Sequence, residues 1–187
     1  MYTLKNNPKF FLLIAFVVLG FCLPMWMAKA YADAASFQIE LIVFGQTGNT
    51  DETFGQTESR LAWPQELVEL STFAMAEKTL TTPYIALSAR ANYQPLFHAA
   101  WVQSFPADSW GSPVHIIDMH GRLNGYISLQ RGQMLQLKAD FEYQPGEADL
   151  SGKPVVYRLA ENRVIKFNEL HYFDHPKLGV VAKVTPL

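Results

Sequence analysis

The sequence has almost no cysteine: Cys22 is the only one among its 187 residues. Cys22 lies in an uncharged apolar run, residues 10–23, near the N-terminus. If this N-terminal segment is removed, the mature protein has no thiol, and so no disulfide, no thiolate metal site and no cysteine nucleophile. Because nothing then cross-links the chain, a hydrophobic core must hold the fold, and a chain of this size can build one in a single domain.

A recognisable catalytic motif is also missing. Serines are present, but none stands in a G-x-S-x-G setting, and no particular pair of acidic residues is nominated for sugar cleavage. No internal repeat or low-complexity segment is visible. These absences favour a non-enzymatic binding protein. Two alternatives stay open: an envelope adaptor that binds another protein and no glycan, and a metal-dependent or glycan-cleaving envelope enzyme.

The N-terminal segment has the organisation of a cleavable export signal. Lys5 and Lys9 supply a positive start, the apolar run follows, and Pro24 ends it. Small residues stand two apart in the alanine-rich stretch beyond Pro24, as signal peptidase requires. We therefore predict cleavage after Ala32.

Two other roles for this segment are less favoured. A retained transmembrane anchor over residues 10–27 would have 18 residues, the lower limit for spanning a bilayer. A lipoprotein would need a small residue before Cys22, where Phe21 stands. The prediction is a signal peptide, residues 1–32, followed by a single mature periplasmic domain, residues 33–187.

Cleavage would change the charge of the protein. The whole chain has 15 basic and 17 acidic residues, a net charge of −2. Three lysines leave with the signal peptide, so 12 basic and 17 acidic residues remain, a net charge of −5. No basic run survives, which disfavours nucleic acid as a partner. Contact with a membrane is expected only through the signal peptide before cleavage.

The hydrophobic pattern of the mature chain is mainly β. Residues 37–44 alternate at first and then become apolar on both faces, which predicts a strand at the centre of a sheet. The clearest signal is a hairpin over residues 123–143, with a turn at Arg131 and Gly132. The alternation of apolar and polar residues predicts that one face of the hairpin is buried and the other is exposed to solvent.

The other expected elements are shorter. Helices are expected at residues 63–70 and 84–91, and further strands at residues 96–103, 114–119, 155–160, 163–167 and 179–184. Glu161 and Asn162 are expected to form a turn between two of these strands. The resulting fold class is α+β, mainly antiparallel β, with about seven strands and one or two short helices packed on the sheet.

The densest polar cluster lies in residues 169–176, ELHYFDHP. His171 and His175 are four residues apart, which on a helix would suit a metal. Pro176 and the aromatic residues favour a strand instead, with Tyr172 and Asp174 on the face opposite to the histidines. A metal site would then need a distant third ligand: His98, His115 or His120. We predict no metal and no cofactor.

The mature chain keeps three tryptophans, Trp63, Trp101 and Trp110. Aromatic faces with nearby polar groups can hold sugar rings or peptide stems. Most of these rings are expected in the core. Trp110 is the ring expected to be exposed, because it lies in a loop with Pro106 and Gly111.

Four stretches together resemble a known family: IELIVF, PLFHAAWVQ, LNGYISLQRGQMLQLKADFEY and ELHYFDHPKLGVVAKVTP. They are similar to the CsiV family of periplasmic peptidoglycan-binding proteins of gammaproteobacteria. The combination of a His-x-x-Trp-x-Gln block with a terminal HYFDHP-x-x-G block carries the resemblance, which runs through most of the mature chain.

The resemblance implies a non-enzymatic role in cell-wall growth and cell shape. The implied partners are peptidoglycan and an outer-membrane lipoprotein activator of a class A penicillin-binding protein. Seven residues match the family's motifs, and with Trp110 they form the candidate ligand set: His98, Trp101, Gln103, His171, Tyr172, Asp174 and His175.

Overall fold

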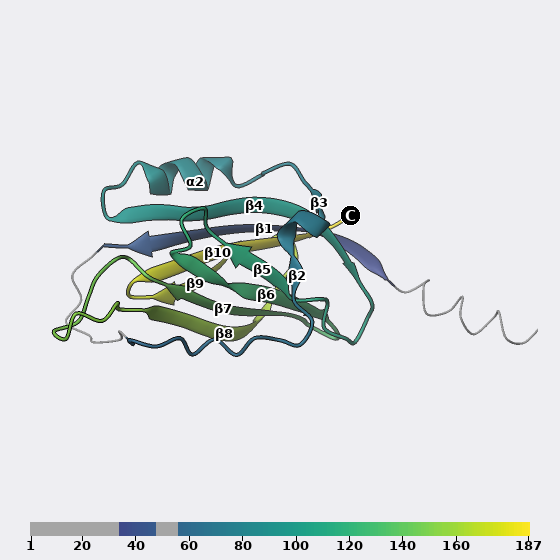
Figure 1. Cartoon of the computed structure of the whole chain (residues 1–187). Helices are drawn as coiled ribbons and strands as arrows, with labels where there is room; N and C mark the ends of the chain where they lie inside the picture. The colour runs from purple at the N-terminus through teal and green to yellow at the C-terminus, as the bar shows by residue number, and fades with distance from the viewer. Residues whose placement is uncertain (1–33, 48–55) are drawn as a thin grey trace, which may run out of the picture. The chain divides into compact units, whose positions relative to one another are not determined.

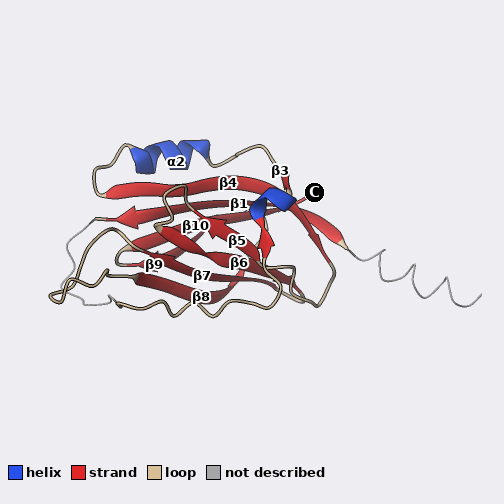
Figure 2. Ribbon diagram, viewed as in Figure 1, coloured by secondary structure: helices blue, strands red, loops and turns tan. Residues whose placement is uncertain are grey.

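The computed structural model describes residues 34–47 and 56–187 (Figure 1). The predicted signal peptide, residues 1–32, lies outside the described residues. Two five-stranded sheets make up the described part of the chain, with one α-helix and one 3-10 turn. Figure 2 shows the predominance of strand. The expected α+β, mainly antiparallel β fold class is confirmed, with ten strands rather than about seven.

The first sheet has the order β3-β4-β1-β10-β9. Its central strand is β1 (Ala35–Gln46), which pairs antiparallel with β4 (Tyr93–Phe105) and β10 (Leu178–Pro186). The prediction of a central strand from its two apolar faces is confirmed. The edges are β3 (Ala74–Met75) and β9 (His171–His175).

The second sheet has the order β2-β5-β6-β7-β8. The hairpin of β6 (Leu123–Arg131) and β7 (Leu135–Tyr143) is present as expected. Strand β5 (Val114–Ile117) pairs with β6, and β8 (Tyr157–Ile165) pairs with β7, both antiparallel. The two-residue β2 (Val68–Glu69) is parallel to β5.

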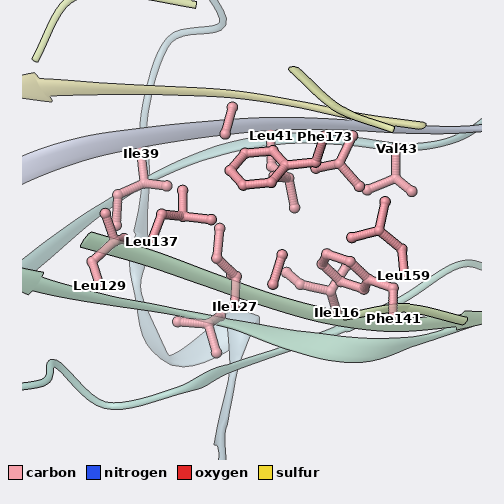
Figure 3. Packing of buried hydrophobic residues seen from close by; sticks show 14 of the residues in the cluster. Ile39, Leu41, Val43, Ile116, Ile127, Leu129, Leu137, Phe141, Leu159 and Phe173 are labelled. Carbon is pink, nitrogen blue, oxygen red and sulfur yellow. The ribbon is translucent and has the colours of Figure 1, made fainter. Parts of the chain in front are cut away.

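The inner faces of the two sheets meet in one hydrophobic cluster (Figure 3). Ile39, Leu41 and Val43 of β1 are buried in the same cluster as Ile127 of β6 and Phe141 of β7. Ile39, Leu41 and Val43 stand two apart along β1 and therefore point to one face of the sheet. Complete burial of each such side chain contributes about 1.5–3 kcal/mol relative to exposure.

One helix, α2 (Thr81–Ser88), lies against the outer face of the first sheet. Leu80 before the helix packs with Ile42 and Phe44 of β1, and Tyr84 and Leu87 cover the same cluster. The helix expected over residues 84–91 therefore exists but begins three residues earlier.

The prediction of a second helix, over residues 63–70, is wrong. Residues 61–67 contain no helix, Val68 begins β2, and only the 3-10 turn η1 (Leu70–Thr72) follows. Val68 pairs with Val114 of β5, and this tertiary pairing outweighs the local preference for a helix that starts at Pro64.

The expected turn at Glu161 and Asn162 is also wrong. The strands predicted on either side of it form the single strand β8, which pairs with β7 along its whole length. Glu161 lies opposite Ala139 and Asn162 opposite Lys138. Continuous pairing with a neighbouring strand satisfies the backbone here, so the turn preference of Asn162 is not expressed.

None of the helices in the described ranges is long and apolar enough to cross a bilayer.

Candidate functional site

The two blocks that resemble the family motif lie in the same sheet but apart. His98, Trp101 and Gln103 belong to β4, whereas Tyr172 and Asp174 belong to β9. Two strands, β1 and β10, separate β4 from β9. The two blocks therefore do not form one shared surface.

His98 contacts a buried carboxylate on the outer face of the first sheet. Its Nε2 atom lies 2.8 Å from Oε1 of Glu40, and both side chains are almost wholly buried. The same carboxylate accepts hydrogen bonds from the backbone N–H groups of Thr79 and Leu80, at 2.8 and 2.9 Å, and from the Thr79 hydroxyl. Four donors thus converge on one carboxylate.

This arrangement stabilises the ionised form of Glu40. Burial alone would raise the pKa of Glu40, but the hydrogen bonds from His98, Leu80 and Thr79 outweigh it and hold the pKa below its ordinary value. Tyr84 of α2 stacks on the His98 ring, with centroids 4.7 Å apart. His98 therefore fixes the chain that enters α2.

Trp101 and Gln103 are buried in the interior. The Trp101 indole N–H donates to Oε1 of Gln103, and the Gln103 amide donates to the backbone carbonyl of Ser112 at 2.8 Å. The pair joins β4 to the loop that carries Trp110. Their burial indicates that they support that loop from the core side.

The residues of β9 alternate as the strand interpretation predicted. Phe173 is buried, and Tyr172 and Asp174 lie on the other face. The Tyr172 hydroxyl donates to Oδ1 of Asp174 at 2.6 Å, and the Gln46 amide donates to both side chains. Burial, with the neighbouring Asp174, raises the pKa of Tyr172. These bonds tie β9 to the end of β1.

The two histidines of β9 bond to nearby backbone. The His171 ring contacts the backbone of Lys166, and Nδ1 of His175 accepts the N–H of Lys177 at 3.2 Å. Burial lowers the pKa of His175, against the opposing effect of Asp174. Within residues 34–47 and 56–187, no three His, Cys, Asp or Glu side chains are grouped so that they could hold a metal ion.

The outer face of the second sheet is crossed by residues 56–67, which we call the strap. Oε1 of Glu142 on β7 accepts the Gln56 amide at 2.8 Å and the Arg60 backbone N–H at 2.6 Å. Further along, the Tyr126 hydroxyl donates to the carbonyl of Ala62. In Figure 1 this stretch passes below β8 and β7 towards β2.

The strap changes what was expected of this face. The hairpin pattern predicted that this face is exposed to solvent. Four residues on it are buried instead: Tyr126, Ser128, Asp140 and Glu142. Asp140 forms a bidentate salt bridge with Arg158 of β8, in which each carboxylate oxygen accepts a hydrogen bond of 2.8 Å. Side-chain alternation correctly separated the two faces, but it did not show that a loop covers the second one.

Between the end of the strap and the loop of Trp110 lies a groove of about 470 Å³. We call it the tryptophan groove. It is lined by strap residues Pro64 and Glu66, by residues 110–113, and by Tyr126, Ser128, Lys138 and Asn162 of the sheet. Its size lies in the range of small-ligand sites.

Two half-exposed tryptophans lie at this groove: Trp110 lines it, and Trp63 stands beside it, next to the lining residue Pro64. Trp110 is 42% exposed, as its loop position led us to expect, and Trp63 is 45% exposed. Trp63 approaches Tyr126 with centroids 6.2 Å apart and meets His115 edge to face at 5.6 Å. Trp110 thus exposes ring surface inside the groove, and Trp63 exposes ring surface next to it.

The polar groups of the groove add little net charge. Lys138 places Nζ 5.3 Å from the centroid of the Tyr126 ring, and within the described part of the chain it forms no ion pair. Glu66 supplies an exposed carboxylate, while Ser128 and Asn162 are neutral hydrogen-bonding groups. Sequence reasoning missed Glu66, Ser128, Lys138 and Asn162, because nothing local distinguishes them from other surface positions.

A second hollow, of about 380 Å³, lies between loops at the end of the second sheet. It is lined by His120, Arg122, Gln144, Glu147 and neighbouring glycine, alanine, proline and valine residues. No aromatic ring lines it except the imidazole of His120.

The fold and the groove define the class of protein as a two-sheet, mainly antiparallel β protein with an aromatic-lined groove on one outer face. The sequence itself matches the family model described as "Peptidoglycan-binding protein, CsiV" over residues 9–187. The chain belongs to the CsiV family. No curated protein and no solved structure matches it.

Proposed function

We propose that the chain is a non-enzymatic periplasmic protein that binds peptidoglycan. The observation that carries the proposal is the match of almost the whole chain to a family described as peptidoglycan-binding. The structure supports it with the tryptophan groove, where ring faces and polar groups are both accessible. The export signal proposed for residues 1–32 would bring the protein to the wall.

The arrangement of polar side chains supports binding over catalysis. Buried Glu40, Asp140 and Glu142 each hold another part of the chain through hydrogen bonds. The carboxylates of a glycosidase must instead face the scissile bond. The role assigned to these three groups is to maintain the fold.

We further propose that this protein supports cell-wall synthesis through an outer-membrane lipoprotein activator of a class A penicillin-binding protein. The family resemblance motivates this partner. The test is the rate of glycan polymerisation by the synthase and its activator, with and without the protein. An unchanged rate across a wide range of protein concentration would exclude this partnership and leave wall binding unaffected.

The test of wall binding is sedimentation with purified sacculi. The full chain is expressed with its own leader and purified from the periplasmic fraction, and its N-terminus is sequenced. We expect a start near Asp33 and co-sedimentation at low and moderate salt, with no release of soluble wall fragments. Protein that stays in the supernatant contradicts binding, and released fragments contradict the non-enzymatic role.

A further inference from the structure

We propose that the tryptophan groove is the wall-binding site, and that its ligand is the glycan strand of N-acetylated sugars rather than the stem peptide. This inference rests on the proposed function and assigns it to particular residues. One sugar ring would stack on Trp110 in the groove and a neighbouring ring on Trp63 beside it, while the polar groups of the groove bond to hydroxyl and acetamido groups.

The exposure of the two tryptophans is the first argument. Trp101 shows that the fold can bury an indole completely, at 0% exposure, whereas Trp63 and Trp110 keep more than two fifths of their surface in solvent. Large aromatic rings that remain exposed beside polar groups are typical of binding sites. The apolar faces of sugar rings match such flat surfaces.

The charge of the groove is the second argument, and it selects the glycan. Stem peptides carry several carboxylates, which would call for a cluster of cations. The groove offers one ammonium, Lys138, and one carboxylate, Glu66, with Ser128 and Asn162 as neutral groups. This nearly balanced set fits an uncharged sugar backbone better than an acidic peptide.

The rigidity of the groove is the third argument. Trp110 forms a β-bridge with Gln130 of β6, and the next residue, Gly111, donates its N–H to the carbonyl of Leu129 at 2.7 Å. On the other side the strap is held through Tyr126 and the carbonyl of Ala62. A site fixed in this way loses little conformational entropy when it binds.

The test compares single and double substitutions of the exposed tryptophans. Trp63→Ala and Trp110→Ala should each weaken sacculus binding by about tenfold, the scale of an anchoring aromatic residue, and the double variant should weaken it further. Ile85→Ala is the control, because Ile85 is a large apolar residue, 60% exposed, on the helix that covers the other sheet. It should bind like wild type.

Competition identifies the part of the wall that is bound. An oligomer of N-acetylglucosamine should displace the protein from sacculi and change its tryptophan fluorescence, whereas free stem peptide should do neither. Displacement by the peptide alone would overturn the choice of glycan. Undiminished binding by the double tryptophan variant would overturn the site, and the proposed function would still stand.

Folding is checked by circular dichroism and thermal unfolding of each variant. If a tryptophan variant fails to fold, the double variant Lys138→Ala with Asn162→Ala replaces it, because it removes groove polar groups and leaves the rings in place. We expect about a threefold loss of binding from this variant. A wild type that does not bind sacculi at all refutes the proposed function itself, which separates the two failures.

Discussion

The outer faces of the two sheets are closed in different ways. On the first sheet, α2 and Leu80 cover an apolar patch that includes Ile42 and Phe44. On the second sheet, the extended strap crosses polar residues of the hairpin, and the tryptophan groove stays open between the strap and the Trp110 loop. The helix buries the patch beneath it, and we call this part of the first sheet the sealed face, although Tyr172 at the β9 edge stays exposed. The strap leaves part of its face open.

Both outer faces nevertheless hold their covering segment in the same way. A buried carboxylate, Glu40 on one sheet and Glu142 on the other, accepts backbone N–H groups from the segment that crosses it. The motif residue His98 lies on the sealed face and completes the Glu40 cluster. In our proposal, the sealed face serves stability and the partly open face binds the wall.

The largest effect is expected when Glu40 is removed. Glu40→Ala leaves His98 and the backbone N–H groups of Thr79 and Leu80 without their partner, and breaking a buried pair such as Glu40 with His98 costs about 3–5 kcal/mol. Urea unfolding followed by circular dichroism measures the loss. Where the variant is still folded, its sacculus binding should match wild type.

The control for this change is Glu69→Ala. Glu69 also pairs with a histidine, His115, at 2.8 Å, but its side chain is 63% exposed. An exposed pair is worth less than about 1 kcal/mol. Equal losses from the two glutamate variants would show that burial does not distinguish the faces and would remove the basis of the comparison.

A smaller and more local effect is expected at Glu142. Glu142→Ala removes the acceptor of two strap groups, the Gln56 amide and the Arg60 N–H. The expected loss in free energy of unfolding is about 1–3 kcal/mol. Hydrogen exchange should rise in residues 56–62 before the rest of the sheet opens. Sacculus binding should fall, because the strap forms one wall of the groove.

Asp149→Ala provides the matched control for the strap. Asp149 accepts the N–H groups of Ser151 and Lys153 and so holds a different loop of the same sheet. Its exchange should rise only within residues 149–153, with binding unchanged. Faster exchange of the strap in this variant would contradict the assignment of Glu142 as its anchor.

Acid sensitivity should distinguish the faces further. Because the folded-state pKa of Glu40 is lowered, its stabilising contribution is present above the ordinary value of 4.5 and is lost as the pH falls through the lowered pKa. The stability gap between wild type and Glu40→Gln should therefore narrow below about pH 4.5. Urea midpoints at several pH values test this, and a gap that stays constant would contradict it.

The strands that sequence predicts well are those whose pattern is local. The two apolar faces of β1 and the alternation of β6 and β7 reflect the burial of consecutive residues, so they can be read without knowledge of neighbours. The strand through Glu161 and Asn162 depends on pairing with β7, and the absence of a helix at Pro64 depends on pairing with β5. Such distant partners are invisible in one segment.

The same limit applies to the candidate site. The exposure of Trp110 follows from its loop, so it was predictable. Lys138 and Asn162 come together only because β7 and β8 pair in this register. Conversely, His98, Trp101 and Gln103 carry the family resemblance and lie in or near the interior, where they support the loop and helix around them.

The smallest effect is expected at the β9 edge, the remaining motif cluster. Tyr172→Phe removes one hydroxyl, which donates to Asp174 and accepts from Gln46 near the surface. The loss should be about 0.5–1 kcal/mol by urea unfolding. Sacculus binding should be unchanged, since this edge lies on the sheet opposite to the tryptophan groove. Weakened binding at unchanged stability would instead make the β9 edge part of the ligand site, and the division between a sealed face and a binding face would fail there.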